Sequence, residues 1–233
     1  MHNSQLTIKE LPNHIGIMMD GNRRWAKKRG LPTAMGHLKG ADVFKERVHD
    51  LSDMGIKHAT FFAFSTENLN RRADEVSGLM RLFESQLDEL MKTAEKDIRL
   101  IFIGDLSVFT DKLQKKAAQV EQESAGNKGM VCRLALNYGG RAEITRAVSR
   151  LILFSPRGNV TEQEFADELY TKGAPDVDFI IRTGGEKRLS NFLLWQAAYA
   201  ELYFTDTLWC DFNKDELTIA LNDYASRNRR FGN

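Results

Sequence analysis

Short apolar runs alternate with amphipathic segments along most of this chain. Continuous runs rich in β-branched or aromatic residues predict strands over 15–19, 59–64, 99–103, 131–137, 179–182 and 202–204. Helical spacing predicts helices over 36–54, 74–96, 111–123, 142–153, 162–170 and 214–226. This alternation predicts an α/β fold, in which a mainly parallel central sheet of about six strands is flanked by helices.

The predicted helix over 74–96 has a strongly apolar face. Its apolar residues recur at helical spacing: Val76, Leu79, Met80, Phe83, Leu87, Leu90 and Met91. Such a face either packs on the sheet or forms one wall of an apolar tunnel. Periodicity alone does not distinguish the two.

Length and composition limit the possible classes of protein. A chain of 233 residues suits a single domain, here 14–233, preceded by a polar segment over 1–13 that we expect to be flexible. The net charge of +1 gives no general attraction to nucleic acid, so no nucleic-acid partner is expected. Cys132 and Cys210 stand alone, which disfavours zinc or a disulfide framework and fits a reducing, cytoplasmic location. No apolar run approaches the roughly 18 residues that a membrane span needs.

Polar residues gather where the predicted strands end. Asp20, Gly21, Asn22, Arg23, Arg24 and Trp25 follow the first strand, and Arg29 and His37 continue that cluster. Two more clusters are Ser65, Thr66, Glu67 and Asn68 with Arg71 and Arg72, and then Arg182 to Asn191, while Glu201 stands near the start of the last apolar run. Because ligands of open α/β sheets bind at the carboxyl edge of the strands, the three clusters that directly follow strands together point to one site.

The residue types in these clusters suit a diphosphate with a metal ion. Glycine allows the backbone to approach a ligand closely, and arginine forks match phosphate oxygens. Helix N-terminal amides attract anions, and Mg²⁺ usually takes one or two carboxylates together with substrate oxygens. Each cluster also has a plainer interpretation: Asp-Gly-Asn is a common turn, residues 27–29 could be a solvated helix face, His37 could be structural and Glu201 a surface charge. The sequence has no P-loop, no Gly-x-Gly-x-x-Gly after the first strand and no Gly-x-Ser-x-Gly.

Longer motifs make the chain recognisable. They are His-Ile-Gly-Ile-Met-Met-Asp-Gly-Asn-Arg-Arg-Trp-Ala, Phe-Ser-Thr-Glu-Asn, Asn-Tyr-Gly-Gly-Arg, the segment 182–196, Ala-Glu-Leu-Tyr-Phe and Arg-Arg-Phe-Gly. From 14 to 232 the chain resembles the cis-prenyltransferases, and most of all their bacterial undecaprenyl diphosphate synthases. The resemblance implies a Mg²⁺-dependent homodimer with an apolar tunnel. Such enzymes extend an allylic diphosphate, usually farnesyl diphosphate, with isopentenyl diphosphate through cis double bonds, and the product serves as a cell-wall carrier lipid.

The resemblance also implies roles for individual residues. Asp20 and Glu201 would hold Mg²⁺, and Asp20, Asn22 and Asn68 would be catalytic, Asn22 lying near the point where the condensation proton is lost. Gly21, Asn22, Arg23, Arg24 and His37 would bind the allylic diphosphate, and Arg182, Arg188 and Ser190 the isopentenyl diphosphate. Ser65 and Asn68 would support the reacting ends, with further substrate contacts from Trp25, Arg29, Thr66, Glu67 and Arg71. Arg230 and Gly232 would reach toward the partner subunit's active site.

Three departures from the family pattern bear on the product. Thr33 stands where the bacterial synthases commonly have an arginine, Leu69 replaces a usual tryptophan and Arg72 a usual proline. These changes leave open a divergent enzyme with a shorter or unusual cis-prenyl product. A non-catalytic partner subunit is a third reading, which the retained Asp20, Arg182 and Glu201 disfavour. Since no membrane anchor is visible, we expect transient contact with a membrane surface when a long lipid product leaves.

Overall fold

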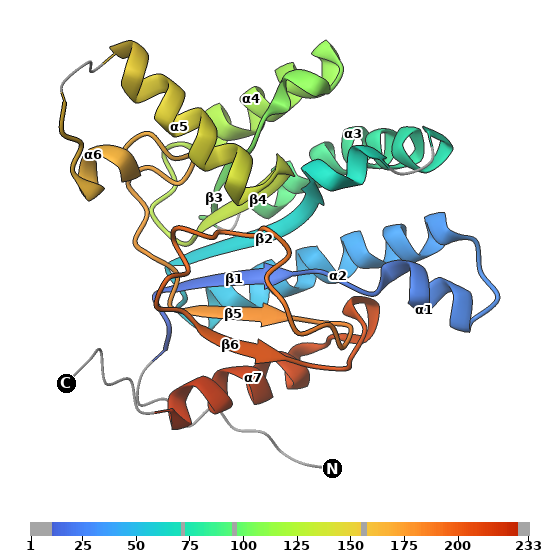
Figure 1. Ribbon diagram of the computed structural model, residues 1–233. Coiled ribbons are helices and arrows are strands. Elements are labelled where there is room, and N and C mark those ends of the chain that lie inside the picture. Colours follow the sequence, from blue (N-terminus) through green and yellow to red (C-terminus); the bar gives the residue numbers. More distant parts are fainter. Residues whose placement is uncertain (1–10, 71–72, 95–96, 155–157, 228–233) are drawn as a thin grey trace.

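The computed structural model describes residues 11–70, 73–94, 97–154 and 158–227. Six strands form one sheet: β1 (His14–Met18), β2 (His58–Ser65), β3 (Arg99–Ile103), β4 (Val131–Tyr138), β5 (Phe179–Arg182) and β6 (Glu201–Phe204). Their order is β3-β4-β2-β1-β5-β6, and every neighbouring pair is parallel (Figure 1). The predicted fold class is therefore confirmed.

The helices fall close to their predicted positions, with one clear exception. They are α1 (Asn22–Lys28), α2 (Thr33–Asp53), α3 (Ala73–Ala94), α4 (Asp111–Ser124), α5 (Gly140–Phe154), α6 (Glu162–Ala166) and α7 (Lys214–Ser226). The helix predicted over 162–170 begins at Glu162 as expected, but its predicted end is wrong, because α6 ends at Ala166. After Ala166 the backbone changes to i→i−3 hydrogen bonds, from the Glu168 N–H to the Phe165 carbonyl and from the Leu169 N–H to the Ala166 carbonyl. The Tyr170 N–H then donates to the buried Glu143 carboxylate at 2.9 Å.

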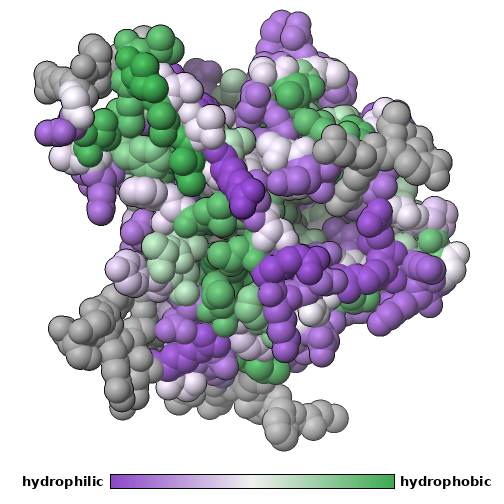
Figure 2. All heavy atoms as spheres, viewed as in Figure 1, coloured by the Kyte–Doolittle hydropathy of each residue, from purple (hydrophilic) through white to green (hydrophobic). Residues whose placement is uncertain are grey.

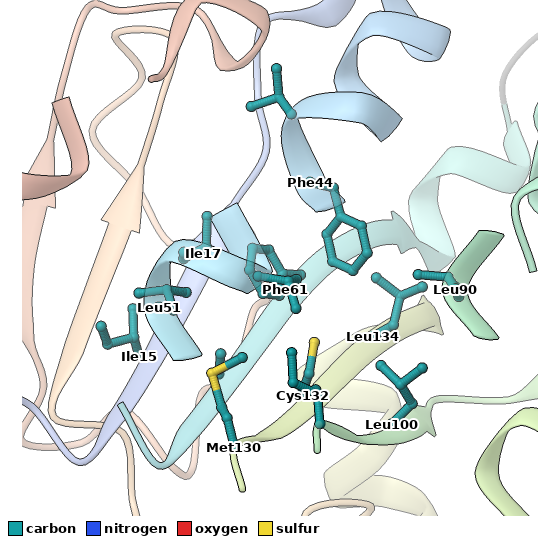
Figure 3. Close-up of a cluster of buried hydrophobic side chains, with 14 of the residues drawn as sticks. Ile15, Ile17, Phe44, Leu51, Phe61, Leu90, Leu100, Met130, Cys132 and Leu134 are labelled. Atoms are coloured by element: carbon teal, nitrogen blue, oxygen red, sulfur yellow. The ribbon is translucent and has the colours of Figure 1, made fainter. Parts of the chain in front are cut away.

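Two apolar layers cover the sheet. On one face α2, α3, α4 and α7 pack over the strands, and Figure 3 shows Phe44 of α2 and Leu90 of α3 directed toward Leu134 of β4. On the other face Tyr138 and Ile180 pack with Phe192 and Leu193, which belong to the segment between β5 and β6. Fully burying a side chain of this size contributes roughly 1.5–3 kcal/mol. A sheet covered on both faces explains why its strands are continuous apolar runs.

The strand order creates a switch point beside β1. The chain crosses from β1 to β2 on one side, whereas β5 pairs with β1 on the other, and Met18 is in register with both Phe62 and Arg182. The residues that follow β1, β2 and β5 therefore emerge side by side at one edge of the sheet, the usual place for a ligand in such folds.

The ends of the chain relate to two sequence predictions. Residues 1–10 lie outside the described part of the chain, so the predicted flexible segment over 1–13 stays a prediction. Among the described residues, no helix is both long enough and apolar enough to cross a membrane.

Candidate active site

A cleft of about 720 Å³ opens beyond the carboxyl ends of β1, β2 and β5. Most of the predicted site residues line it: Asp20, Gly21, Asn22, Arg23, Arg24, His37, Ser65, Glu67, Asn68, Arg182, Arg188 and Ser190. Residues separated by up to 170 positions in the sequence thus share one cleft. The parallel register explains this, since each cluster directly follows a strand.

Two guanidinium groups flank the Asp20 carboxylate. Arg24 Nη2 lies 3.4 Å from Asp20 Oδ1, and Arg182 Nη2 lies 3.2 Å from Asp20 Oδ2. The backbone carbonyl of Asp20 accepts hydrogen bonds from Thr183 Oγ1 at 2.8 Å and from the Trp209 N–H at 3.0 Å. These backbone contacts fix the turn after β1 and direct the carboxylate into the cleft.

Arg182 is the most buried cation of the cleft, with 5% of its surface exposed. Its Nη1 donates to Ser190 Oγ at 2.8 Å and to the Arg188 carbonyl, while its Nε is buried without a hydrogen-bond partner. An unsatisfied buried N–H costs free energy unless something pairs with it. The guanidinium therefore retains a donor for an anion bound beside Asp20.

Two glycines allow the backbone to pass close to Asp20 and Arg24. Gly21 has a φ of +118°, and a Cβ there would lie 2.9 Å from Leu208 Cδ2. Gly184 has a φ of +86°, and a Cβ there would lie 2.6 Å from Arg24 Nη2, whose neighbouring Nη1 donates to the Gly184 carbonyl at 2.6 Å. Any other residue at these positions would be strained and would displace Arg24 or the turn.

Asn22, the first residue of α1, is contacted by the thiol of Cys210. Cys210 Sγ lies 3.3 Å from Asn22 Oδ1 and 3.3 Å from the Gly36 carbonyl. Burial raises the pKa of Cys210 to about 11, so the thiol keeps its proton at neutral pH and can donate. With Oδ1 accepting from the thiol, the amide N–H₂ of Asn22 is available to the cleft. A Cβ at Gly40 of α2 would lie 2.7 Å from Asn22 Oδ1, so this position of α2 needs a residue without a side chain.

A second anchor joins the β2 end to the segment after β5. Asn191 Nδ2 donates to Glu67 Oε1 at 2.9 Å, and Asn191 Oδ1 accepts from the Arg141 N–H at 2.8 Å. Desolvation acts to raise the pKa of Glu67, but hydrogen bonds from its own N–H and from Asn191, Ser65 and Thr66 outweigh it and lower the pKa. Asn68 Oδ1 accepts from the Ser65 N–H at 3.2 Å.

The polar cleft continues into an apolar cavity of about 100 Å³ between the sheet, α2 and α3. Met19, Asn22, His37, Ala63 and Leu79 line both spaces. The apolar face of α3 supplies Leu79, Phe83, Leu87 and Leu90, facing Ala41 and Phe44 of α2 and Leu134 and Leu136 of β4. The two interpretations of the α3 stripe are therefore compatible, because the same residues pack on the sheet and line an apolar cavity.

The structure does not bring every predicted residue to the cleft. Trp25 Nε1 donates to Asp211 Oδ1 at 2.7 Å, and the Arg29 guanidinium lies 4.3 Å above the Trp25 ring and 3.2 Å from the same carboxylate. Both side chains are thereby turned toward Asp211, outside the cleft lining. Thr66 is not among the residues that line the cleft, and its Oγ1 lies against Gly139, where an added Cβ would be 2.7 Å away.

Glu201, the second predicted Mg²⁺ ligand, does not lie near Asp20 of the same chain. Glu201 begins β6 and is in register with Phe179, whereas the Asp20 edge lies beyond Arg182 at the other end of β5. Its carboxylate instead accepts from Arg227 Nη1 at 2.7 Å. The strand that carries Glu201 runs toward the cleft, so a residue at its start cannot lie there. Arg71, Arg72, Arg230 and Gly232 fall outside the described residues.

The donor set suits a metal that is bound together with substrate. In the described part of the chain no three His, Cys, Asp or Glu side chains converge into a protein-only metal site. Asp20 offers one carboxylate in a cleft lined by arginines, and Mg²⁺ bound through one carboxylate and diphosphate oxygens fits that arrangement.

Sequence reasoning missed Cys210, whose role depends on packing. Cys210 contacts Asn22 from 188 positions away, and no local pattern marks it. Asn191 belongs to the polar cluster after β5, but its contact with Glu67, 124 positions away, is seen only in the fold.

Known proteins are similar to this chain in both sequence and fold. Residues 18–232 match the family described as "Putative undecaprenyl diphosphate synthase". An isoprenyl transferase of Fusobacterium nucleatum is 47% identical over 96% of this chain and 97% of its own length. A ditrans,polycis-undecaprenyl-diphosphate synthase of Vibrio vulnificus, named as (2E,6E)-farnesyl-diphosphate specific, is 44% identical over 100% and 95% of the two lengths.

Two solved structures align over almost their whole length. Lavandulyl diphosphate synthase from Lavandula x intermedia, in complex with dimethylallyl diphosphate, has a TM-score of 0.91 and 39% identity over 96% of this chain and 99% of its own. A "probable undecaprenyl diphosphate synthase" from Campylobacter jejuni has a TM-score of 0.81 and 35% identity, covering 97% and 100%. The family expected from the motifs is confirmed: this chain belongs to the undecaprenyl diphosphate synthase family of prenyltransferases.

Proposed function

We propose that this protein is a Mg²⁺-dependent cis-prenyltransferase that extends farnesyl diphosphate with isopentenyl diphosphate to undecaprenyl diphosphate, for use as a cell-wall carrier lipid. One observation carries the proposal: a cleft lined by arginines, with an aspartate at its centre, opens directly into an apolar cavity. The cleft suits two diphosphate groups, and the cavity suits the isoprenoid chain attached to one of them.

The two sides of the cleft have different tasks in this reaction. Arg23, Arg24 and the Gly21–Asn22 backbone hold the allylic diphosphate, whose chain enters the cavity past His37 and Leu79. Arg182, Ser190 and Arg188 hold isopentenyl diphosphate on the other side of Asp20. Fixed guanidinium donors stabilise the negative charge that grows on the departing diphosphate, which is the largest kind of electrostatic contribution to catalysis.

Asn22 donates its amide N–H₂ where the new bond forms, and a diphosphate oxygen takes the proton that the condensation releases. Among the described residues that line the cleft, the carboxylates and histidines are Asp20, Glu67, Glu186 and His37. Asp20 would hold Mg²⁺ on the diphosphates, where the ion supplies charge neutralisation for the leaving group.

The length of the product depends on how far the cavity extends. At about 100 Å³ the cavity is well below the roughly 300–1,000 Å³ of ordinary ligand pockets, so a long chain must push α2 and α3 apart. This narrowness, together with Thr33 and Leu69, supports a second candidate function. In that alternative the enzyme makes a shorter or unusual cis-prenyl diphosphate; the structurally similar lavandulyl diphosphate synthase was solved in complex with dimethylallyl diphosphate, a short allylic diphosphate.

We also propose that the protein acts as a homodimer. Val148, Ile152 and Leu153 of α5 are 44%, 68% and 72% exposed, and Figure 2 shows the resulting run of apolar surface along this helix. Tyr199 and Leu202, beside and on the edge strand β6, are 78% and 36% exposed. Such apolar surface supports burial against a second copy. In a dimer Glu201 could serve only the partner's site, because its own Asp20 lies at the other end of the sheet.

A direct test follows the transfer of label. The purified chain is incubated with farnesyl diphosphate, labelled isopentenyl diphosphate and Mg²⁺, and label is counted in the lipid-extractable fraction. We expect incorporation that requires Mg²⁺ and that falls at least 100-fold in Asp20→Asn. Incorporation that is unchanged both without Mg²⁺ and in Asp20→Asn would refute the proposed site. Cytoplasmic location and transient membrane contact remain part of this proposal.

A further inference from the structure

Positive charge is concentrated in one short stretch. Residues 22–39 hold six lysines and arginines and no carboxylate, although the net charge of the chain is only +1. The remainder of the chain is therefore net negative. Arg23 and Arg24 line the cleft and Arg29 pairs with Asp211. Lys27 and Lys28, in contrast, are exposed, and neither makes an ion pair with a described residue.

Apolar side chains occupy the same corner of the molecule. Leu31, Met35 and Leu38 are 39%, 46% and 42% exposed. Met35 and Leu38 are one helical turn apart on α2, and Leu31 stands four positions before Met35, in the connection from α1. Figure 1 shows this connection projecting from the edge of the molecule, away from the sheet. We call residues 27–38 the α1–α2 corner.

The corner adjoins a second opening of the apolar cavity. A groove of about 540 Å³ runs between α2 and α3, with Thr33, Ala34 and Leu38 on its α2 side. The groove shares His37, Leu79 and Leu82 with the cavity that would hold the isoprenoid chain. An apolar chain leaving the cavity by this route would emerge beside Leu38.

We propose that the α1–α2 corner docks on an anionic lipid bilayer, so that this groove faces the membrane. Exposed apolar side chains beside unpaired lysines are the combination that suits a negatively charged bilayer surface. The inference rests on the proposed function in one respect, since a groove that faces the membrane would allow a long lipid product to pass directly into the bilayer. It goes beyond that function by naming the surface and the charge of the partner.

The closing experiment measures binding to vesicles without substrate. The full chain is floated with vesicles of phosphatidylcholine alone or with 30 mol % phosphatidylglycerol, a composition chosen to vary only charge. We expect binding to the anionic vesicles that weakens with salt. The double variant Lys27→Ser/Lys28→Ser should bind them about 30-fold more weakly, from roughly a fivefold effect of each lysine near a charged surface. Leu31→Ser/Met35→Ser should also lose binding.

Two matched controls use exposed residues elsewhere on the molecule. Lys115→Ser/Lys128→Ser removes the same charge, and Val108→Ser/Ile219→Ser removes side chains that are 47% and 46% exposed. Both controls should bind vesicles as the unmodified chain does. Equal losses in the controls, or equal binding to neutral and anionic vesicles, would overturn the proposal. So would a Leu31→Ser/Met35→Ser variant that keeps vesicle binding but forms smaller oligomers, because the corner would then be a contact between copies.

Condensation of isopentenyl diphosphate is measured on the same preparations without vesicles. The variants of the corner should keep this activity. A chain that binds anionic vesicles through the corner but condenses nothing would refute the proposed function and not the docking surface. The two failures are thereby distinguishable.

Discussion

Replacing Arg182 with lysine tests how the cleft binds its second diphosphate. Lysine keeps the positive charge but loses the planar fork that reaches Asp20, Ser190 and the Arg188 carbonyl, together with the buried Nε that has no partner in the described structure. One charge-assisted hydrogen bond to an anion contributes about 1.5–3 kcal/mol. Arg182→Lys should therefore lower kcat/KM for isopentenyl diphosphate about 10- to 150-fold.

The assay is steady-state kinetics with each substrate varied in turn. Because Arg182 stands with Ser190 on the side of Asp20 away from Arg24, the KM for isopentenyl diphosphate should rise more than that for the allylic diphosphate. Arg47→Lys is the matched control. Arg47 is also 5% exposed and bonds to a carboxylate and a carbonyl, those of Asp50 and Phe212, but it lies outside the cleft.

The control separates binding from general damage to the fold. Arg47→Lys should lower the unfolding temperature and leave KM for isopentenyl diphosphate within twofold. An Arg182→Lys enzyme with unchanged kcat/KM, or an Arg47→Lys enzyme with the same kinetic loss, would refute this reading of the cleft.

Three further predictions concern the packing around the site and the fold. Cys210→Ala should lower kcat about 2- to 10-fold, because the Asn22 amide loses one neutral hydrogen bond. Cys210→Ser should restore kcat, and Cys132→Ala, at the other buried cysteine, should leave it unchanged. Equal kcat values for the two Cys210 variants would contradict this. Leu134→Trp should fill the cavity and shift the products toward shorter chains by mass spectrometry, and an unchanged product distribution would show that the chain grows elsewhere. Burial lowers the pKa of His14 to about 4, so the unfolded chain binds more protons than the folded chain between pH 6.5 and 4. About 3 kcal/mol of stability that is present above pH 6.5 should therefore be lost as the pH falls through 4. Urea unfolding at several pH values should show this slope, and the slope should flatten in His14→Gln.

Local patterns sufficed for the fold and for most of the cleft. Strands buried on both faces must be continuous apolar runs, so β1 to β6 could be located from sequence, and their parallel order then placed Asp20, Ser65 and Arg182 at one edge. The same logic separates Glu201 from Asp20 of its own chain, because Glu201 precedes an apolar run, whereas Asp20 follows one.

Other features depended on contacts that sequence does not encode locally. The segment after α6 is held by Glu143, 27 positions away, which accepts a hydrogen bond from the Tyr170 N–H. Trp25 and Arg29 lie next to the cleft residues in sequence, but Asp211, more than 180 positions away, turns them aside. The thiol beneath Asn22 likewise comes from a distant turn. In each case the deciding partner was known only once the chain was folded.

The central claim is that the arginine-lined cleft and the apolar cavity together build a long cis-prenyl chain. Mass spectrometry of the products that the purified chain forms from isopentenyl diphosphate and Mg²⁺, with farnesyl or dimethylallyl diphosphate as primer, tests it most directly. The account predicts undecaprenyl diphosphate as the dominant product from farnesyl diphosphate. A product that stops after one condensation, or coupling of two dimethylallyl units without isopentenyl diphosphate, would contradict it.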